Sequence, residues 1–245
     1  MEYRADFFIS IVGILIENTI AVLFYSIIFT KVPSINGWTY HQLLFMYGFL
    51  VTCSSIFHIF CGNLFQIKGY LRSGSFIKFY FRPANILFSY ISETIDIKSI
   101  FQFMIGVVLL AQSSIGLGMN WALSDLILLI LLILTTAALI ISLMTTVASL
   151  GFWVRDPSAL MDFMMNVRSY SRYPLSIYNR TFQLIFSTVV PVGFMAYYPS
   201  LIFLTARASD NLWIIPTQLV MTALFGSIAV FVFHKGTKRY AGTGS

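Results

Sequence analysis

Residues 122–150 read ALSDLILLILLILTTAALIISLMTTVASL, and Asp125 is the only charged residue in this stretch. An α-helix needs about 20 apolar residues to cross the roughly 30 Å hydrocarbon core of a membrane, so this stretch is long enough to span it. Four more apolar runs are also long enough, at residues 7–30, 41–62, 99–118 and 212–233. The sequence therefore predicts an all-α, polytopic membrane protein.

The composition excludes a soluble protein. Of the 245 residues, 58% are hydrophobic and only 10% are charged, whereas soluble domains carry about 25% charged residues. A soluble enzyme and a nucleic-acid-binding protein are therefore excluded. Cys53 and Cys61 lie in one apolar run and give no disulfide framework.

Basic residues indicate on which side of the membrane the loops lie. They gather in residues 63–98 and at the C-terminus, as Lys68, Arg72, Lys78, Arg82 and Lys98, then Lys235, Lys238 and Arg239. Loops rich in Lys and Arg remain in the cytoplasm. Both regions, and with them the N-terminus, are expected inside the cell. This sidedness requires an even number of spans, and the length of the chain predicts six.

Residues 151–211 allow two interpretations of the remaining span. In the first, 157–173 form a short span, and 174–207 form a re-entrant region outside the cell. In the second, 151–180 form an amphipathic helix on the cytoplasmic surface, and 181–204 cross the membrane.

The sequence does not decide between the two interpretations. The second places Arg168, Arg172 and Arg180 inside the cell, as the distribution of basic residues favours. Pro191 and Pro199 favour broken helices, which are tolerated where they are buried against protein and so suit the first.

Polar residues inside the apolar runs are candidates for a translocation path. Glu17 and Asn18 lie midway along the first run, where a carboxylate costs ~2.5–3.5 kcal/mol on insertion scales. They line a substrate path or a proton site, or they form hydrogen bonds at a helix interface. A polar stripe at helical spacing adds Ser158, Asp162, Asn166 and Ser169.

Segment 70–83 is too short to span a membrane and too aromatic for a plain solvated loop. Pro83 disfavours a helical conformation at Arg82, which predicts a short helix from about Ser75, capped near Gly74. The helix would carry Phe76, Lys78, Phe79 and Tyr80. It is either a basic amphipathic helix on anionic headgroups or a docking surface with aromatic anchors for a soluble cytoplasmic partner.

The sequence contains no motif for catalysis or for metal binding. A phosphate-binding loop of the form GxxxxGK[ST] is absent, so the chain is not expected to hydrolyse ATP by itself. His58 and Cys61 are three residues apart, but no second pair completes a four-ligand metal site. We expect no catalytic residue, bound cofactor or metal in this chain.

The order and spacing of several short elements resemble the ABC-2 type permeases of ABC transporters, in a subgroup of long-uncharacterised export permeases. The resemblance covers nearly the whole chain. It includes Tyr3-Arg4-Ala5-Asp6-Phe7, Gly37-Trp38, Arg72-Ser73-Gly74, Arg82-Pro83, Phe152-Trp153, Tyr173-Pro174-Leu175-Ser176-Ile177-Tyr178, Pro191, Tyr197-Tyr198-Pro199 and Arg239-Tyr240.

The resemblance implies a half-transporter whose single transmembrane domain, residues 1–245, has six spans. It would pair with a second permease chain, identical or homologous, and with two copies of an ABC ATPase subunit that bind ATP and Mg. The family's coupling helix would correspond to segment 70–83, through Leu71, Arg72, Gly74, Phe76, Lys78, Phe79, Tyr80, Arg82 and Pro83.

The resemblance also implies a bacterial plasma membrane location with both termini in the cytoplasm. Residues 174–178 would form the extracellular turn before a re-entrant helical pair, which favours the first interpretation of residues 151–211.

Two departures from the family pattern are visible. The family often has acidic residues in the coupling segment where this chain has Ser75 and Ile77, so the electrostatics of the partner contact are expected to differ. Family members also usually carry an amphipathic helix before the element at residues 3–7. Here Met1 begins almost on that element, so we expect a shortened interfacial elbow or a misassigned start.

The leading functional hypothesis is an ATP-driven exporter that moves a small amphipathic molecule, a drug or a peptide by alternating access. The substrate class comes from the resemblance alone. One alternative, a membrane-embedded lipid-modifying enzyme, would need His, Asp or Glu clustered at one membrane face. Another, a stand-alone secondary transporter, would favour inverted repeats. Neither pattern is found in the sequence.

Overall fold

The computed structural model describes residues 2–154, 156–205 and 211–240, and the side chains of residues 2–5 are not described. The side chains of the element at residues 3–5, and the end of the predicted re-entrant region at 206–207, therefore lie outside the described part of the structure. Within the described residues the fold is all helical, apart from an isolated bridge between Ile35 and Trp38.

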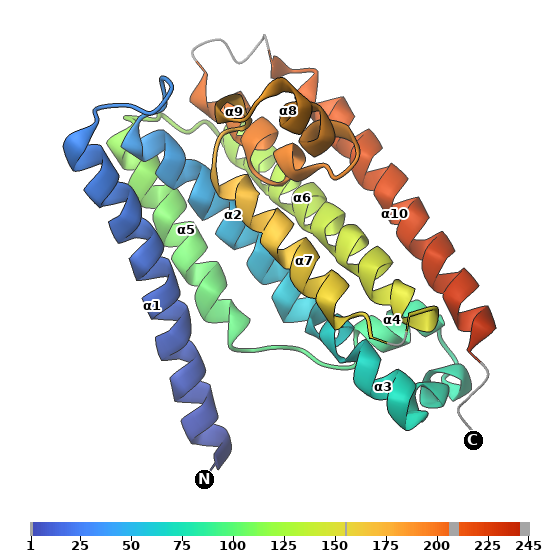
Figure 1. Cartoon of the computed structure of the whole chain (residues 1–245). Coiled ribbons are helices and arrows are strands. Elements are labelled where there is room, and N and C mark those ends of the chain that lie inside the picture. The colour runs from blue at the N-terminus through green and yellow to red at the C-terminus, as the bar shows by residue number, and fades with distance from the viewer. Residues whose placement is uncertain (1, 155, 206–210, 241–245) are drawn as a thin grey trace.

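Five of the described helices are long and apolar enough to cross a membrane. They are α1 (Glu2–Lys31), α2 (Tyr40–Cys61), α5 (Ser99–Gly116), α6 (Leu123–Ser149) and α10 (Ile214–Arg239). Each of the five apolar runs predicted from the sequence falls on one of these helices. The prediction of an all-α polytopic membrane protein is confirmed (Figure 1).

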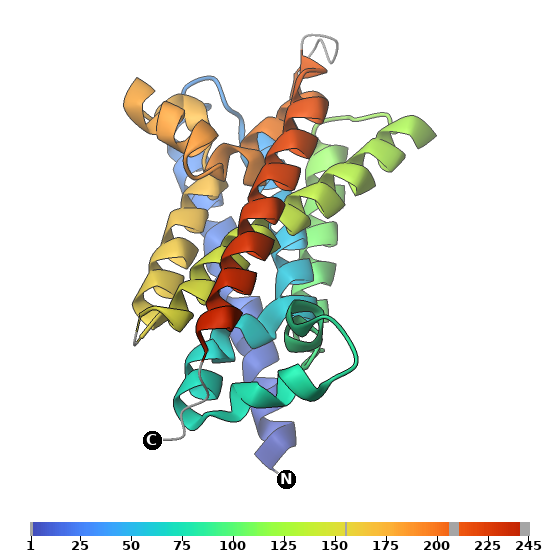
Figure 2. The ribbon, with the colours of Figure 1, turned by 90° about the vertical axis from the view of Figure 1, so that its right-hand side faces the viewer.

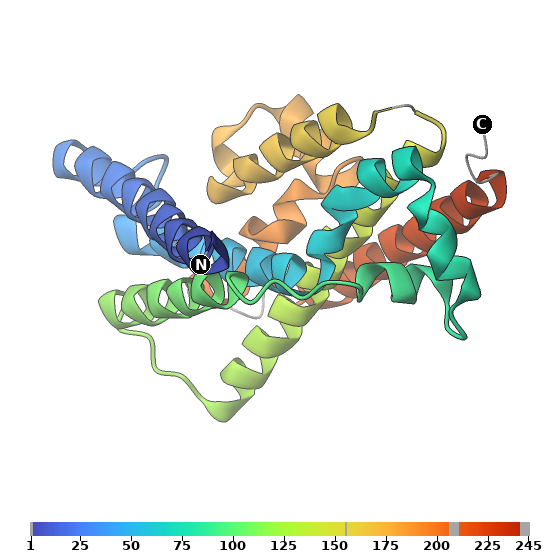
Figure 3. The same ribbon diagram turned by 90° about the horizontal axis from the view of Figure 1, so that it is seen from below.

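The helix α2 forms the centre of the bundle. In its most apolar stretch 78% of the residues are buried, compared with 6% in α1. It packs against α5 and α6, whereas α1 and α10 lie at opposite edges of the bundle (Figure 3). The apolar side chains exposed along α1 are therefore available to lipid.

Two glycines let α2 and α5 approach closely. A Cβ atom added to Gly106 of α5 would lie 2.7 Å from the backbone nitrogen of Thr52, and one added to Gly48 of α2 would lie 2.9 Å from that of Leu110. Small residues at such positions are typical of tightly packed membrane helices, because they allow the backbones to meet.

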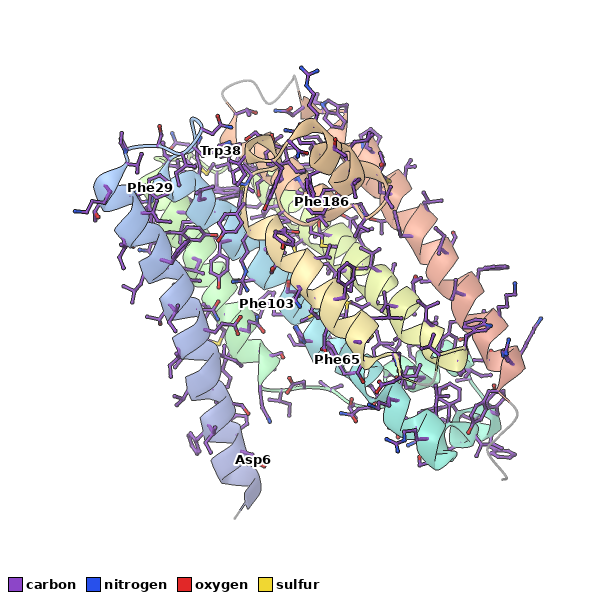
Figure 4. The ribbon with its side chains drawn as sticks, in the orientation of Figure 1. Asp6, Phe29, Trp38, Phe65, Phe103 and Phe186 are labelled. Carbon is purple, nitrogen blue, oxygen red and sulfur yellow. The ribbon has the colours of Figure 1, made fainter. Side chains whose placement is uncertain are left out.

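The two termini and residues 62–98 lie at one end of the bundle, which we call the terminal end (Figures 1 and 2). The loops at 32–39 and 117–122 lie at the other, which we call the loop end. Trp38 and Phe186 are seen near the loop end, and Phe65 lies toward the terminal end (Figure 4).

Residues 157–178 run from the terminal end to the loop end. The helix α7 (Ser158–Ser169) packs against α6, and the 3₁₀ helix η4 (Tyr170–Arg172) continues it beside α2. Beyond η4, Ser176 meets the loop between α1 and α2. Its backbone oxygen accepts a hydrogen bond from Asn36 Nδ2 at 3.0 Å, and its Oγ accepts one from Trp38 Nε1 at 3.0 Å.

Residues 181–204 do not form one continuous helix. They are divided into α8 (Arg180–Thr188), the 3₁₀ helix η6 (Val192–Met195) and α9 (Tyr197–Leu204). Pro191 lies in the break after α8, and Pro199 lies in the first turn of α9, where its missing N–H would have no intrahelical partner. Both prolines thus fit short helices better than a single crossing.

Candidate functional site

Segment 70–83 folds as two short helices around a glycine. The helix α3 (Ile67–Ser73) ends at Gly74, whose φ of 73° lies in the left-handed region that favours glycine. The next helix, η2 (Ser75–Phe81), is a 3₁₀ helix, and Arg82 before Pro83 is extended. The boundaries of this helix agree with the sequence prediction, although its type does not.

Phe76 and Phe79 do not lie on an exposed surface that could face a partner, contrary to the prediction from the sequence. Both are fully buried within the chain. The ring of Phe76 lies 5.2 Å from that of Phe152 and 5.5 Å from that of Tyr90, and Phe79 lies 5.3 Å from Tyr90. The two phenylalanines therefore fix the segment to the bundle. Burial of their rings removes apolar surface from water, and this stabilises the packing of the segment.

Tyr80 is partly exposed, and its hydroxyl joins η2 to the end of α10. It donates a hydrogen bond of 2.6 Å to the backbone oxygen of Thr237, and its ring stacks on Tyr240. The Tyr240 hydroxyl donates in turn to the backbone oxygen of Gly74 at 2.8 Å. Burial raises the pKa of both tyrosines, so both hydroxyls remain protonated donors at neutral pH.

The outward face of η2 is formed by Ile77 and Phe81. Their exposed fractions are 46% and 81%. Neither residue was predicted from sequence as an anchor for a partner. With three residues per turn in a 3₁₀ helix, Phe76 and Phe79 share one face, and Ile77 and Phe81 lie on the other two. No local signal distinguished them, because aromatic residues occupy more than one face of the segment.

Two of the three basic residues of the segment, Lys78 and Arg82, are bound within the chain. Glu93, which lies beyond the segment, accepts Lys78 Nζ on Oε1 at 2.6 Å and Arg82 Nη2 on Oε2 at 2.6 Å. The hydrogen bond from Lys78 lowers the pKa of Glu93, and the same contact raises the pKa of Lys78. Both side chains are held against the chain by Glu93, although its single carboxylate balances only one of their two positive charges. The remaining predicted residues, Leu71 and Arg72, are partly buried and exposed, respectively.

A second site is a partly open polar cavity of about 230 Å³ bordered by α1, α2, α5 and the stretch from α7 to η4. Four of the six candidate path residues line it, namely Glu17, Asn18, Asn166 and Ser169. The other two, Ser158 and Asp162, do not line this cavity, and Asp162 is exposed.

A chain of polar contacts orders one wall of the cavity. Glu17 pairs with Arg172 at 3.6 Å, and the Arg172 guanidinium lies 5.7 Å from the centre of the Tyr47 ring. The Tyr47 hydroxyl donates to Asn18 Oδ1 at 3.0 Å, and Asn18 Nδ2 donates to the backbone oxygen of Ile14. These contacts provide polar partners for Glu17 and Asn18, the two side chains of the first apolar run that were predicted as path residues.

Several lining residues were not predicted as path residues. Arg168 and Arg172 were predicted from sequence only as indicators of sidedness, yet both line the cavity with Ser54 and Gln102. Arg168 and Arg172 both lie within four residues of Ser169 in the polar stripe. That proximity in sequence was the signal that they could line the same cavity as Asn166 and Ser169.

The family model described as ABC-2 family transporter protein matches residues 15–244. The chain therefore belongs to the ABC-2 transporter family, and it is a membrane-embedded permease subunit of an ABC transporter. Membership implies association with an ABC ATPase, because the permease of such a transporter is not itself the catalytic subunit. No curated protein and no solved structure matches the chain.

Proposed function

We propose that this chain is the permease half of an ATP-driven exporter in a bacterial plasma membrane, with both termini in the cytoplasm. It works with a second permease, identical or homologous, and with two ATPase subunits that bind ATP and Mg. The cargo is a small amphipathic molecule, a drug or a peptide. The observation that carries the proposal is segment 70–83, which presents Ile77 and Phe81 at the terminal end of a transporter-family bundle.

The packing of segment 70–83 supports a coupling role. A partner that moves η2 also moves Phe76 and Phe79, which contact Phe152 and Tyr90 inside the bundle. The bonds from Tyr80 and Tyr240 carry the same movement to α10. ATP-driven closure of the partner subunits would thus reach the membrane helices through η2, and alternate the access of the cavity beside Glu17.

Replacing Ile77 and Phe81 together by Ala is expected to weaken binding of the ATPase by about tenfold or more, since truncated interface aromatics commonly lose over 1.4 kcal/mol. Thermal stability should change little, because both side chains are exposed. Co-purification and ATPase activity in detergent measure the effect. Phe182→Ala is the matched control, since Phe182 is 49% exposed on α8, near the opposite end. Equal ATPase binding by the double variant and the control would contradict the docking role.

The proposed topology has 157–173 as the short fifth span, 174–207 as the re-entrant region and 70–83 inside the cell. It predicts opposite labelling at two exposed isoleucines. Ile177 lies next to Ser176 and is 40% exposed, whereas Ile77 is 46% exposed at the other end. Each is replaced by Cys after the buried Cys53 and Cys61 are changed to Ala. An impermeant thiol reagent should label position 177 in intact cells and position 77 only after permeabilisation. The reverse pattern would invert the orientation, and equal protection would place 151–180 on the cytoplasmic surface.

A further inference from the structure

We propose that the polar cavity binds an anionic group, a phosphate or a carboxylate, through Arg168 and Ser54. This inference rests on the proposed function, because it names the chemical class of the transported molecule or of a lipid that occupies its path. Both residues line the cavity, Ser54 from α2 and Arg168 from α7.

The charges around the cavity are unbalanced. Arg168 and Arg172 contribute two guanidinium groups, and Glu17 is the only acidic residue that lines the cavity in the described part of the chain. Glu17 is paired with Arg172, which also lies over the Tyr47 ring. One positive charge, that of Arg168, therefore lacks a counter-charge among the described lining residues.

Hydrogen bonding points to the same residue. The Nη1 atom of Arg168 is buried and has no hydrogen-bond partner among the described residues. The Ser54 hydroxyl, on a residue with only 3% of its surface exposed, is buried and without a partner in the same part of the structure. Buried polar groups are almost always hydrogen-bonded, so two unpartnered groups on residues that line one cavity indicate a missing acceptor in its wall.

An anion satisfies both requirements at once. Water would accept the hydrogen bonds but would leave the charge of Arg168 uncompensated inside a membrane protein, where ionised groups are normally paired. Phosphate and carboxylate oxygens match the fork of donors on a guanidinium, and they accept a hydroxyl as well. A cation would be repelled by the excess positive charge.

The space around the cavity indicates an amphipathic anion. About 230 Å³ is small for a drug-sized molecule, since such ligands occupy roughly 300–1,000 Å³. A neighbouring cavity of about 300 Å³ shares Glu17 and Arg172 with the first and is otherwise lined largely by apolar and aromatic residues, among them Ile20, Ala21 and Phe24. The anionic head fits the polar cavity, and an apolar tail fits its neighbour along α1.

The test uses the permease–ATPase complex in phosphatidylcholine nanodiscs, titrated with dodecyl phosphate and with dodecyltrimethylammonium. The two probes share a tail and differ in the charge of the head. We expect dodecyl phosphate to bind at least about tenfold more tightly, as one charge-assisted contact supplies. Arg168→Gln should abolish this preference and Arg168→Lys should keep part of it. Arg180→Gln is the matched control, because Arg180 is exposed on α8 and outside the cavity.

Equal binding of the two probes, or an unchanged preference in Arg168→Gln, would overturn the inference. If Arg168→Gln does not assemble, Ser54→Ala removes the second donor at little cost in volume and should weaken dodecyl phosphate binding about threefold. An unchanged affinity in Ser54→Ala would then overturn it.

A second arm separates a lipid headgroup from a free solute. Phosphatidylglycerol in the nanodiscs should compete with dodecyl phosphate in the wild type if a headgroup occupies the site. If the site takes a transported solute, dodecyl phosphate should stimulate ATP hydrolysis whether or not phosphatidylglycerol is present. Failure of the two proposals is distinguishable. Loss of the anion preference in a complex that still couples to its ATPase removes only this inference, whereas a wild-type chain that recruits no ATPase removes the proposed function.

Discussion

Phe79→Ala is expected to lower the free energy of unfolding by about 3–5 kcal/mol, the usual cost of truncating a fully buried phenylalanine. Phe79 has no exposed surface, and its ring contacts those of Phe76, Tyr70 and Tyr90. Removing it leaves a cavity among rings that are held in place by one another, so the site has little room to relax.

Thermal unfolding in detergent measures this loss, and Phe81→Ala provides the control from the same short helix. Phe81 is 81% exposed, so its truncation should change stability by less than about 0.5 kcal/mol. The pair separates two roles within one segment, since Phe79 supports the fold and Phe81 faces the partner. Equal melting temperatures for the two variants would mean that the segment is not packed as described.

Gly106→Ala and Gly13→Ala are expected to change stability in opposite directions. Alanine is favoured over glycine inside a helix by about 1 kcal/mol, so Gly13→Ala on α1 should stabilise, because nothing lies within 4 Å of the added Cβ. At Gly106 the Cβ would approach the backbone of Thr52 to 2.7 Å. The two helices must separate, and overpacking of this kind costs about 1–3 kcal/mol.

The same unfolding measurement compares the two glycine variants in one detergent. Because both changes add one methyl group to a membrane helix, propensity and hydrophobicity cancel in the comparison. A stabilised Gly106→Ala would show that α2 and α5 do not approach as closely as Gly48 and Gly106 indicate.

The long helices could be predicted from sequence because hydrocarbon thickness imposes a minimum length on each apolar run. Gly74 and Pro83 likewise marked the limits of η2, since each restricts the backbone at its own position. These are local constraints, and local constraints are visible in a sequence.

The buried face of η2 could not be predicted, because the spacing of its aromatic and apolar residues fits more than one face. Aromatic residues occupy both sides of this short helix, and only the contacts of Phe76 with Phe152 and Phe233, residues far apart in the chain, decide which side is buried. Arg168 was missed for a similar reason. Its place in the wall of the cavity depends on how α7 packs, and the rule used for arginines concerned only the side of the membrane.

The cavity was partly predicted because a carboxylate and an amide in an apolar run, Glu17 and Asn18, require polar neighbours. Which neighbours supply them depends on tertiary structure. Tyr47 and Arg172 fill that role, although nothing in the local sequence of either distinguishes them from other interfacial residues. Asp162 shares a helical stripe with Asn166 but lies too far along α7 to reach the cavity.

The hydrogen bonds from Tyr80 to Thr237 and from Tyr240 to Gly74 make η2 and the end of α10 mechanically stiff. Because η2 is held to the end of α10 at two points, it transmits a displacement with little bending. The compliance that a working cycle requires must then reside elsewhere, and the short helices α8, η6 and α9 near the far end are separated by breaks in the helical backbone. A displacement imposed on η2 at the terminal end would then be accommodated by rearrangement at the loop end. There the short helices α8, η6 and α9 can shift without breaking a long helix.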